Sequence, residues 1–346
     1  MKTRVTELLG IKHPIFQSAM GLVAEPPMVI ASCNAGALGF LTPRDKTADQ
    51  LRNAIRKIRE AIGDKPFGVN MVPLQARYQE YVDIAVEERV PVIGHGAGDF
   101  SYLLGKAKAA GLKVIPSVGT VGQAIKAEKA GADAVIVSGW EAGGHCSYVA
   151  STVIIPATVA KVKIPVISAG GFADGKGLVA ALALGAEAIN MGTRFAITQE
   201  SPIPDRVKQA YVQARAEMAV ETKKVSGLHM RCILGKKAKK YRGWMFSPWT
   251  IIPATISEAR SNDASIREII GMGWRMWRKL HMHPLTFACG IYHGRKSLQG
   301  GDPDWFLPSG QCCGLINDIP TCKELIERIV AEAEQTIDSL KEKASG

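Results

Sequence analysis

One imidazole follows an apolar stretch in the middle of this 346-residue chain. Residues 134–137 read Ala-Val-Ile-Val, and after Ser138 the chain continues as Gly-Trp-Glu-Ala-Gly-Gly to His145. The apolar stretch predicts a buried strand, and glycine-rich turns at the C-terminal ends of such strands commonly carry the chemistry of α/β enzymes. A histidine in such a turn can accept or donate a proton near neutral pH. His145 is therefore the candidate general acid or base.

The other reactive residue types argue against several chemistries. No lysine ends a predicted strand, as a Schiff-base enzyme would require. Glu141 is the only acidic residue in the turn before His145, whereas glycosidases need two converging carboxylates. His281 and His283 form the only close histidine pair and lack nearby acidic or thiolate partners, so no metal site is expected. The seven cysteines show no disulfide-framework spacing and are expected to be reduced thiols.

Strand-like and helix-like segments alternate up to residue 197. Continuous apolar strands separated by amphipathic helical segments predict a parallel sheet covered by helices. Eight such units favour a (β/α)8 TIM barrel, an α/β fold, over an open doubly wound sheet. The predicted strands are residues 14–17, 37–41, 67–71, 90–93, 113–117, 134–138, 165–169 and 188–191.

Two glycine turns follow the seventh and eighth predicted strands. The first is Ala-Gly-Gly-Phe-Ala-Asp-Gly at 169–175, and the second is Met-Gly-Thr-Arg at 191–194. Barrel enzymes commonly bind phosphate in these two loops, where backbone N–H groups can approach the anion. The first strand leads into Gln-Ser-Ala-Met-Gly at 17–21, which lacks the dinucleotide fingerprint of a Rossmann fold. His95, after the fourth strand, is predicted to be a structural turn residue.

Composition divides the chain into three parts. Residues 1–214 form the predicted cofactor-binding barrel, 215–300 a helical insertion (a lid that binds substrate) after strand eight, and 301–346 the return to the barrel and a C-terminal helix. Residues 201–300 hold 18 Lys and Arg against six Asp and Glu, a balance of +12 in a chain whose net charge is +11. The cluster Lys236, Lys237, Lys239, Lys240 and Arg242 either attracts a phosphorylated substrate or forms a solvated face. Ile266, Ile269, Ile270, Gly273, Trp277 and Leu280 predict one apolar helix face that packs on the barrel.

The sequence resembles the nitronate monooxygenase family (formerly 2-nitropropane dioxygenase), whose members are FMN-containing barrels. The motifs that carry the resemblance lie at residues 13–21, 67–71, 139–145, 168–175 and 178–195. The resemblance implies that Gly192 and Thr193 hold the FMN phosphate and that His145 is the catalytic base. The implied cofactor-binding residues are Ala19, Met20, Gly21, Asn70, Ser117, Ser138, Gly143, Gly144, Ala169, Gly170, Gly171, Gly192 and Thr193.

The resemblance favours FMN-dependent oxidation of nitronates or nitroalkanes with O2, in which His145 takes the proton next to the nitro group. An FMN-dependent NAD(P)H:quinone reductase, or an enoyl-thioester (CoA) reductase or dehydrogenase, is the alternative on the same scaffold. A cofactor-free sugar-phosphate isomerase or lyase would use the same phosphate loops. Nucleic acid is not an expected partner, because the basic segment lacks the pattern of a known binding module. No membrane span is predicted, a cytoplasmic location is expected, and a homodimer is compatible with the sequence.

Overall fold

The computed structural model describes residues 1–73, 75, 77–96, 98–225, 229–240, 252–257, 267, 271, 274 and 284–345. Three sequence predictions fall outside these residues: the apolar helix face of the insertion, the close histidine pair, and Arg242 of the basic cluster.

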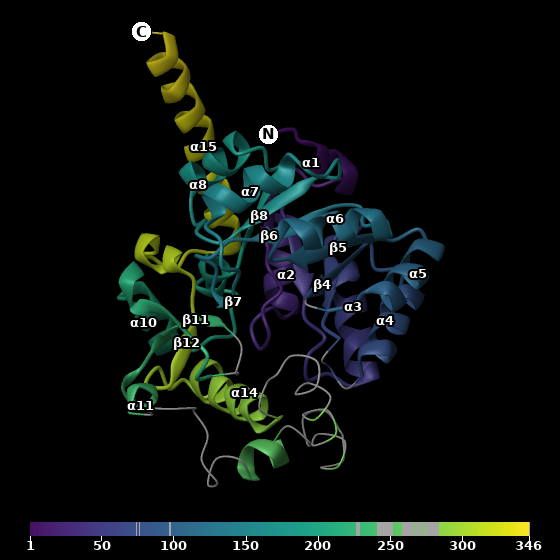
Figure 1. Cartoon of the computed structure of the whole chain (residues 1–346), viewed down its shortest axis with the longest axis vertical. Helices are drawn as coiled ribbons and strands as arrows, with labels where there is room; N and C mark the ends of the chain where they lie inside the picture. The colour runs from purple at the N-terminus through teal and green to yellow at the C-terminus, as the bar shows by residue number, and fades with distance from the viewer. Residues whose placement is uncertain are drawn as a thin grey trace.

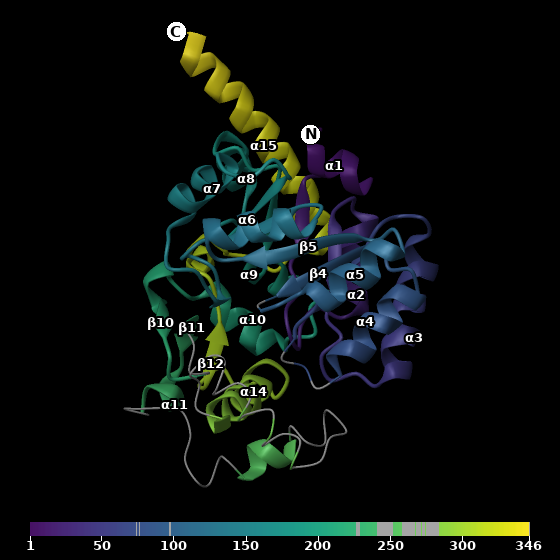
Figure 2. The same ribbon diagram turned by 45° about the vertical axis from the view of Figure 1, so that its right-hand side comes forward.

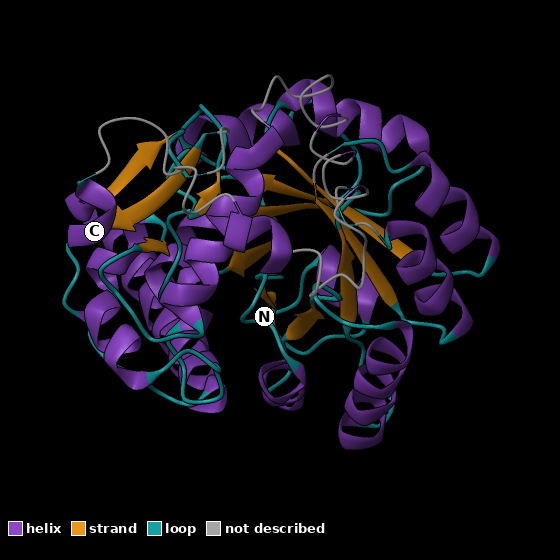
Figure 3. Cartoon of the chain, turned by 90° about the horizontal axis from the view of Figure 1, so that it is seen from below, coloured by secondary structure: helices purple, strands orange, loops and turns teal. Residues whose placement is uncertain are grey.

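Eight parallel strands close into a barrel, as the sequence predicted. Each strand pairs with the next along the chain, apart from the short β7, and β9 pairs with β1 to close the ring. Figure 3 shows the strands surrounded by helices. The barrel strands are β1 (Ile15–Gln17), β2 (Leu38–Leu41), β3 (Gly68–Met71), β4 (Val92–Gly96), β5 (Lys113–Val118), β6 (Val135–Ser138), β8 (Val166–Ala169) and β9 (Ala188–Met191).

An outer ring of helices covers the strands. α3 shows how the sequence sets such a helix: Thr47 accepts a hydrogen bond from the backbone N–H of Gln50, and one apolar face is buried against the barrel. The last helix, α15, packs against both α8 and α2 and so completes the ring, as the sequence predicted. The ring consists of α2 (Pro26–Asn34), α3 (Ala48–Ile62), α4 (Tyr78–Glu87), α5 (Ser101–Ala109), α6 (Val121–Ala130), α7 (Ser151–Val159), α8 (Gly175–Ala183) and α15 (Cys322–Ser345).

The two ends of the barrel differ. At the N-terminal ends of the strands, α1 (Arg4–Leu9) inserts Val5 and Leu9 into the apolar cluster that also contains Phe16 and Phe40 of the barrel interior. Residues 205–225, 229–240 and 284–308 lie toward the opposite end of the molecule, whereas the C-terminal helix α15 runs back to the end that holds α1 (Figure 1). The candidate site is therefore expected at the C-terminal ends of the strands, where barrel enzymes keep their sites.

The insertion contains a small antiparallel sheet as well as helices. Strands β10, β11 and β12 lie side by side (Figure 2), and β11 also pairs with β7, which is Gly144–His145. These strands were not among those predicted from the sequence. The elements after the barrel are α9 (Thr193–Ala196), α10 (Asp205–Val212), η1 (Ala216–Met218), β10 (Ala219–Thr222), β11 (Met230–Leu234), α11 (Lys236–Lys239), α14 (Pro284–Leu298), β12 (Phe306–Pro308) and η2 (Gln311–Leu315).

Candidate active site

His145 is the second residue of β7, and Met230 of β11 lies opposite it in the ladder. The side chain is accessible to solvent. The surrounding protein nevertheless lowers the pKa of His145 by desolvation, and the positive charge of Arg44 lowers this pKa further. His145 is therefore neutral near pH 7 and is suited to accept a proton rather than to donate one.

Arg44 belongs to the site although the sequence analysis did not single it out. It lies in the loop after β2, and its Cδ is 3.3 Å from the position that a Cβ on Gly21 would occupy. Asp45 pairs with Arg295 of α14 at 2.9 Å, and Lys46 pairs with Glu25 at 2.7 Å, so the neighbours of Arg44 tie this loop to the barrel and to the insertion. A cation just beyond a strand end was the signal that could have revealed it.

Three predicted cofactor contacts lie at inward-facing positions near the C-terminal ends of their strands. Side chains alternate between the two faces of a strand. Ile115 and Ile136 belong to the interior cluster, so Ser117 and Ser138, two residues further along, face the same way. Asn70 lies beside Gly94, whose Cβ would come within 2.7 Å of the Asn70 amide oxygen. All three polar side chains are half-buried, which leaves them accessible to a bound molecule.

Asn190 is a further polar residue of this rim that the sequence analysis missed. It follows the interior residue Ala188 by two positions and pairs with Ala169 in the neighbouring strand. Its Nδ2 donates to Ser18 Oγ at 3.1 Å, whereas its buried Oδ1 has no hydrogen-bond partner among the described residues. A buried acceptor without a donor is costly, so the rim fits a cofactor that carries polar N–H or O–H groups.

The first predicted phosphate loop has backbone angles that favour glycine. Gly170 and Gly171 have φ values of +99° and +88°, which side-chain-bearing residues rarely adopt. A Cβ on Gly192 would lie 3.7 Å from the sulfur of Met20, so the loops after β9 and β1 are neighbours. The closed barrel thus brings together Ala19, Met20 and Gly21 with Gly192 and Thr193, as their predicted common role requires.

The return segment after β12 joins two predicted site residues. The Gly310 N–H donates to Thr193 Oγ1 at 2.9 Å, and Gly143 packs directly on the backbone of Ser309 and Gly310. Thr193 Oγ1 is the acceptor of this bond, and the Thr193 hydroxyl also interacts with the side chain of Cys312. The sequence places the return segment with the barrel, but no residue within it was among the predicted site residues.

The basic cluster does not lie beside His145. Lys236, Lys237 and Lys239 form α11, Lys240 follows directly, and all four are exposed. Lys237 pairs with Asp302, whereas Lys236, Lys239 and Lys240 form no ion pair with any described residue. α11 follows the far end of β11, about six residues beyond Met230, or about 20 Å along the chain at 3.3 Å per residue.

Other predicted features prove to be structural. His95 lies within β4 rather than in a turn, buried between Tyr78 and Phe100, and desolvation lowers its pKa to about 4. All seven cysteines are free thiols. Within the described residues, no three His, Cys, Asp or Glu side chains are grouped to hold a metal ion. No helix in the described part of the chain is long and apolar enough to cross a membrane.

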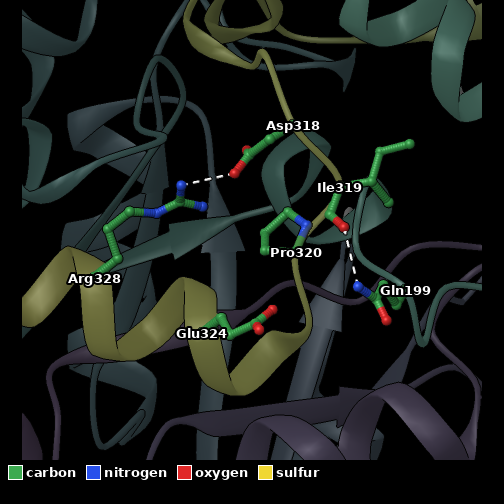
Figure 4. Close-up of a pocket in the computed structure, with 6 residues that line it drawn as sticks. All are labelled: Gln199, Asp318, Ile319, Pro320, Glu324 and Arg328. Atoms are coloured by element: carbon green, nitrogen blue, oxygen red, sulfur yellow. Dashed lines mark hydrogen bonds and ion pairs between the residues drawn. The ribbon is translucent and has the colours of Figure 1, made fainter.

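A separate hollow of about 300 Å³ lies beside the start of α15 (Figure 4). Two charged residues that line this hollow, Arg328 and Asp318, form an ion pair with each other at 2.7 Å. Asp318 also accepts from the buried Arg194, so this region fastens α9 to the C-terminal helix. None of the predicted site residues lines it. The lining residues are Gln199, Asp318, Ile319, Pro320, Glu324 and Arg328.

The fold and the site define a (β/α)8 barrel whose C-terminal strand ends carry small polar residues and whose turn after β6 carries an accessible histidine. The nitronate monooxygenase family model matches residues 2–81 and 71–332, and the chain belongs to this family of flavin-dependent enzymes.

Three known proteins show how the chain relates to its family. It is 37% identical, over 98% of both chains, to a (3aS,4S,5R,7aS)-5-hydroxy-7a-methyl-1-oxo-octahydro-1H-indene-4-carboxyl-CoA dehydrogenase of Rhodococcus jostii. The structure of FabK from Thermotoga maritima is 34% identical, covers 99% of both chains and superposes with a TM-score of 0.81. A probable nitronate monooxygenase of Staphylococcus aureus is 31% identical over 65% of this chain and 76% of its own length.

Proposed function

We propose that the protein is an FMN-dependent oxidoreductase of CoA thioesters, in which His145 takes the proton from the carbon next to the thioester carbonyl. The observation that carries this proposal is the course of β11. One end of this strand pairs with His145, and the other end leads into the exposed lysines of α11. The pantetheine arm of CoA likewise separates the thioester from the nucleotide phosphates, so one extended ligand could contact both ends.

The cofactor assignment is supported by the polar rim and the glycine loops. Gly170, Gly171, Gly192 and Thr193 would hold the FMN phosphate, with backbone N–H groups and one hydroxyl as donors. Asn70, Ser117, Ser138 and Asn190 would face the ribityl chain or the ring. A bound FMN would accept a hydride from the substrate. Mass spectrometry of the cofactor released by heat tests the assignment, and a preparation that is colourless and takes up no added FMN would refute it.

The chain itself supplies the proton transfer and the orientation of the substrate. The lowered pKa of His145 leaves its imidazole unprotonated near pH 7, which favours removal of a proton in a dehydrogenation over delivery of one in a reduction. The cation Arg44 near this imidazole would stabilise negative charge that develops on the thioester oxygen. The identity of 37% to a CoA dehydrogenase over 98% of both chains supports the same direction of reaction.

Substitution of the exposed lysines tests the CoA assignment. We expect Lys236→Gln/Lys239→Gln/Lys240→Gln to weaken CoA binding about tenfold, since each exposed contact is worth about 0.2–1 kcal/mol. Binding of pantetheine, which lacks the phosphates, should not change. Isothermal titration of the holoenzyme measures both. The matched control is Lys57→Gln/Lys126→Gln/Lys129→Gln on the exposed faces of α3 and α6. Equal CoA affinity in both triple variants would refute the assignment.

Nitronate oxidation is the second candidate, because the S. aureus relative is a probable nitronate monooxygenase. A nitronate is a small monoanion and has no use for a distant basic helix. Anaerobic mixing with butyryl-CoA, NADH, NADPH and ethylnitronate in turn shows which compound bleaches the flavin. Bleaching by ethylnitronate alone would favour the second candidate over the first, and bleaching by NADH or NADPH would favour a reductase.

A further inference from the structure

Arg231 is a fully buried cation on β11. This strand pairs with β7 within residues 139–148, the segment that carries His145 and is called the catalytic turn below. Only 2% of its surface is exposed. In the ladder it lies opposite Gly144, one residue before His145. Burying a guanidinium is costly unless its N–H groups find acceptors, and no carboxylate among the described residues lies within ion-pair distance of it. The contacts that replace such a carboxylate show what the side chain does.

The Arg231 guanidinium joins the start of the catalytic turn to β10. Its Nε donates to the carbonyl oxygen of Trp140 at 3.1 Å, and its Nη1 donates to the carbonyl oxygen of Ala219 at 2.7 Å. Its central carbon lies 4.1 Å from the centre of the Trp140 ring, which is a cation–π contact. Arg231 therefore holds Trp140 through both backbone and ring.

The far side of Trp140 is held as well. Its indole N–H donates to Glu221 Oε2 at 2.9 Å, and the other oxygen of Glu221 is bonded to His229. The ring of His229 in turn packs edge-on against Tyr148, at a centroid separation of 4.6 Å. Strands β10 and β11 thus grip the catalytic turn on both sides of His145, at Trp140 and at Tyr148.

The ladder register separates Arg231 from His145, and the Nη2 of Arg231 has no hydrogen-bond partner among the described residues. Opposed residues of a ladder share one face, and successive residues alternate between faces. Arg231 and Gly144 therefore lie on one face, whereas Met230 and His145 lie on the other. We propose that Arg231 is a positioning residue, which sets the place of His145 by fastening Trp140 to β10 and β11. This inference rests on the proposed proton-transfer role of His145.

Only an arginine can make these contacts to the two carbonyl oxygens and the Trp140 ring together. The guanidinium offers several N–H donors in a fixed plane and a flat face for the indole, whereas a lysine offers a point charge at the end of a flexible chain. Arg231→Lys keeps the charge and most of the volume but cannot satisfy both carbonyls and the ring at once. A displacement of about 1 Å in a catalytic group can lower a rate about 100-fold. We expect Arg231→Lys to slow the proton-transfer step by about 10- to 100-fold.

The test compares two probes of the holoenzyme under anaerobic conditions. Nitroethane must lose a proton before it can be oxidised, whereas ethylnitronate has already lost it. Arg231→Lys should slow flavin reduction by nitroethane and leave reduction by ethylnitronate within about twofold. Arg215→Lys is the matched control, because the Arg215 side chain is 80% exposed. Equal losses with both probes, or no loss with either, would overturn the positioning role.

Two further variants separate the possible failures. If His145→Ala does not discriminate between the probes, the proposed role of His145 fails whatever Arg231 does. If His145→Ala discriminates and Arg231→Lys does not, only the positioning role fails. In the His145→Ala background, Arg231→Lys should cause no further loss. Should Arg231→Lys lose flavin or unfold, Trp140→Leu removes the ring that the guanidinium contacts. This variant should show the same selective loss with nitroethane, and equal losses with both probes would again overturn the proposal.

Discussion

Replacing Gly143 by alanine tests whether the return segment belongs to the active site. A Cβ at this position would lie 2.4 Å from the backbone nitrogen of Gly310 and 2.6 Å from the carbonyl carbon of Ser309. Both are backbone atoms, which cannot rotate out of the way as the end of a flexible side chain can. The variant must therefore push the return segment away from the catalytic turn or shift the turn itself.

The energetic cost of Gly143→Ala follows from this contact. Overpacking of this kind costs about 1–3 kcal/mol. The entropy that alanine removes from the unfolded chain offsets at most about 1 kcal/mol. We expect a net loss of about 1–2 kcal/mol, which is a fall of a few degrees in Tm. Because the Gly310 N–H donates to Thr193 Oγ1, the same displacement should loosen the predicted phosphate loop and lower flavin retention.

The matched control is the same substitution where the structure leaves room. Gly105 lies within helix α5, and a Cβ there would meet no atom within 4 Å apart from its chain neighbours and the backbone of its own helix. Gly105→Ala should stabilise the protein by about 0.5–1 kcal/mol, because alanine is the better helix former. Thermal unfolding and the ratio of flavin to protein after gel filtration measure both effects. If Gly143→Ala matched Gly105→Ala in Tm and flavin content, the return segment would not be pressed against the turn.

Two pH dependences follow from the histidines. His95 has a pKa of about 4 in the folded protein against 6.5 in the unfolded chain. Between these two pH values the unfolded chain binds a proton that the folded protein does not. The free energy of unfolding therefore falls as the pH drops from 6.5 to 4, by about 3 kcal/mol in all. Urea unfolding at pH 7 and pH 5 should show this slope, and His95→Phe should flatten it; an unchanged slope would show that His95 is not its source. Arg44→Met removes a charge that lowers the pKa of His145, so the acidic limb of the rate profile should move to higher pH. A rate profile that stays in place would show that Arg44 does not set the pKa of the group that limits the rate.

The barrel could be predicted because its signal is local. Each strand is a short apolar run followed by a helix-length amphipathic segment, and all eight runs correspond to observed strands. The boundaries moved by a few residues at most; β4 begins at Val92 and extends to Gly96, because its glycines and His95 continue the ladder with β5. The C-terminal helix was predicted for the same reason, since its apolar stripe is continuous in the sequence.

The contacts that hold the segment around His145 could not be predicted in the same way, because they join residues that lie far apart in the sequence. β7 is two residues long and pairs with β11 more than 80 residues later, and no sequence period marks such a pairing. Arg231 reads as a surface residue, and only the fold shows it to be buried. Asn190 differs, because an amide in an otherwise apolar strand is visible in the sequence and could have been included in the predicted site.

The small sheet connects two separate parts of the proposed site, the histidine at one end of β11 and the exposed lysines beyond its other end. β11 places Met230 opposite His145 at one end and leads to α11 at the other, so the proposed proton transfer and the proposed contacts to the CoA phosphates both depend on this strand. Substitutions on α11 should therefore change KM and leave kcat alone, because they do not touch the catalytic turn. Substitutions within β11 that move its pairing with β7 should change kcat. Enzymes on this scaffold could then acquire new substrates by altering the distal end of β11 while the proton-transfer apparatus stays fixed.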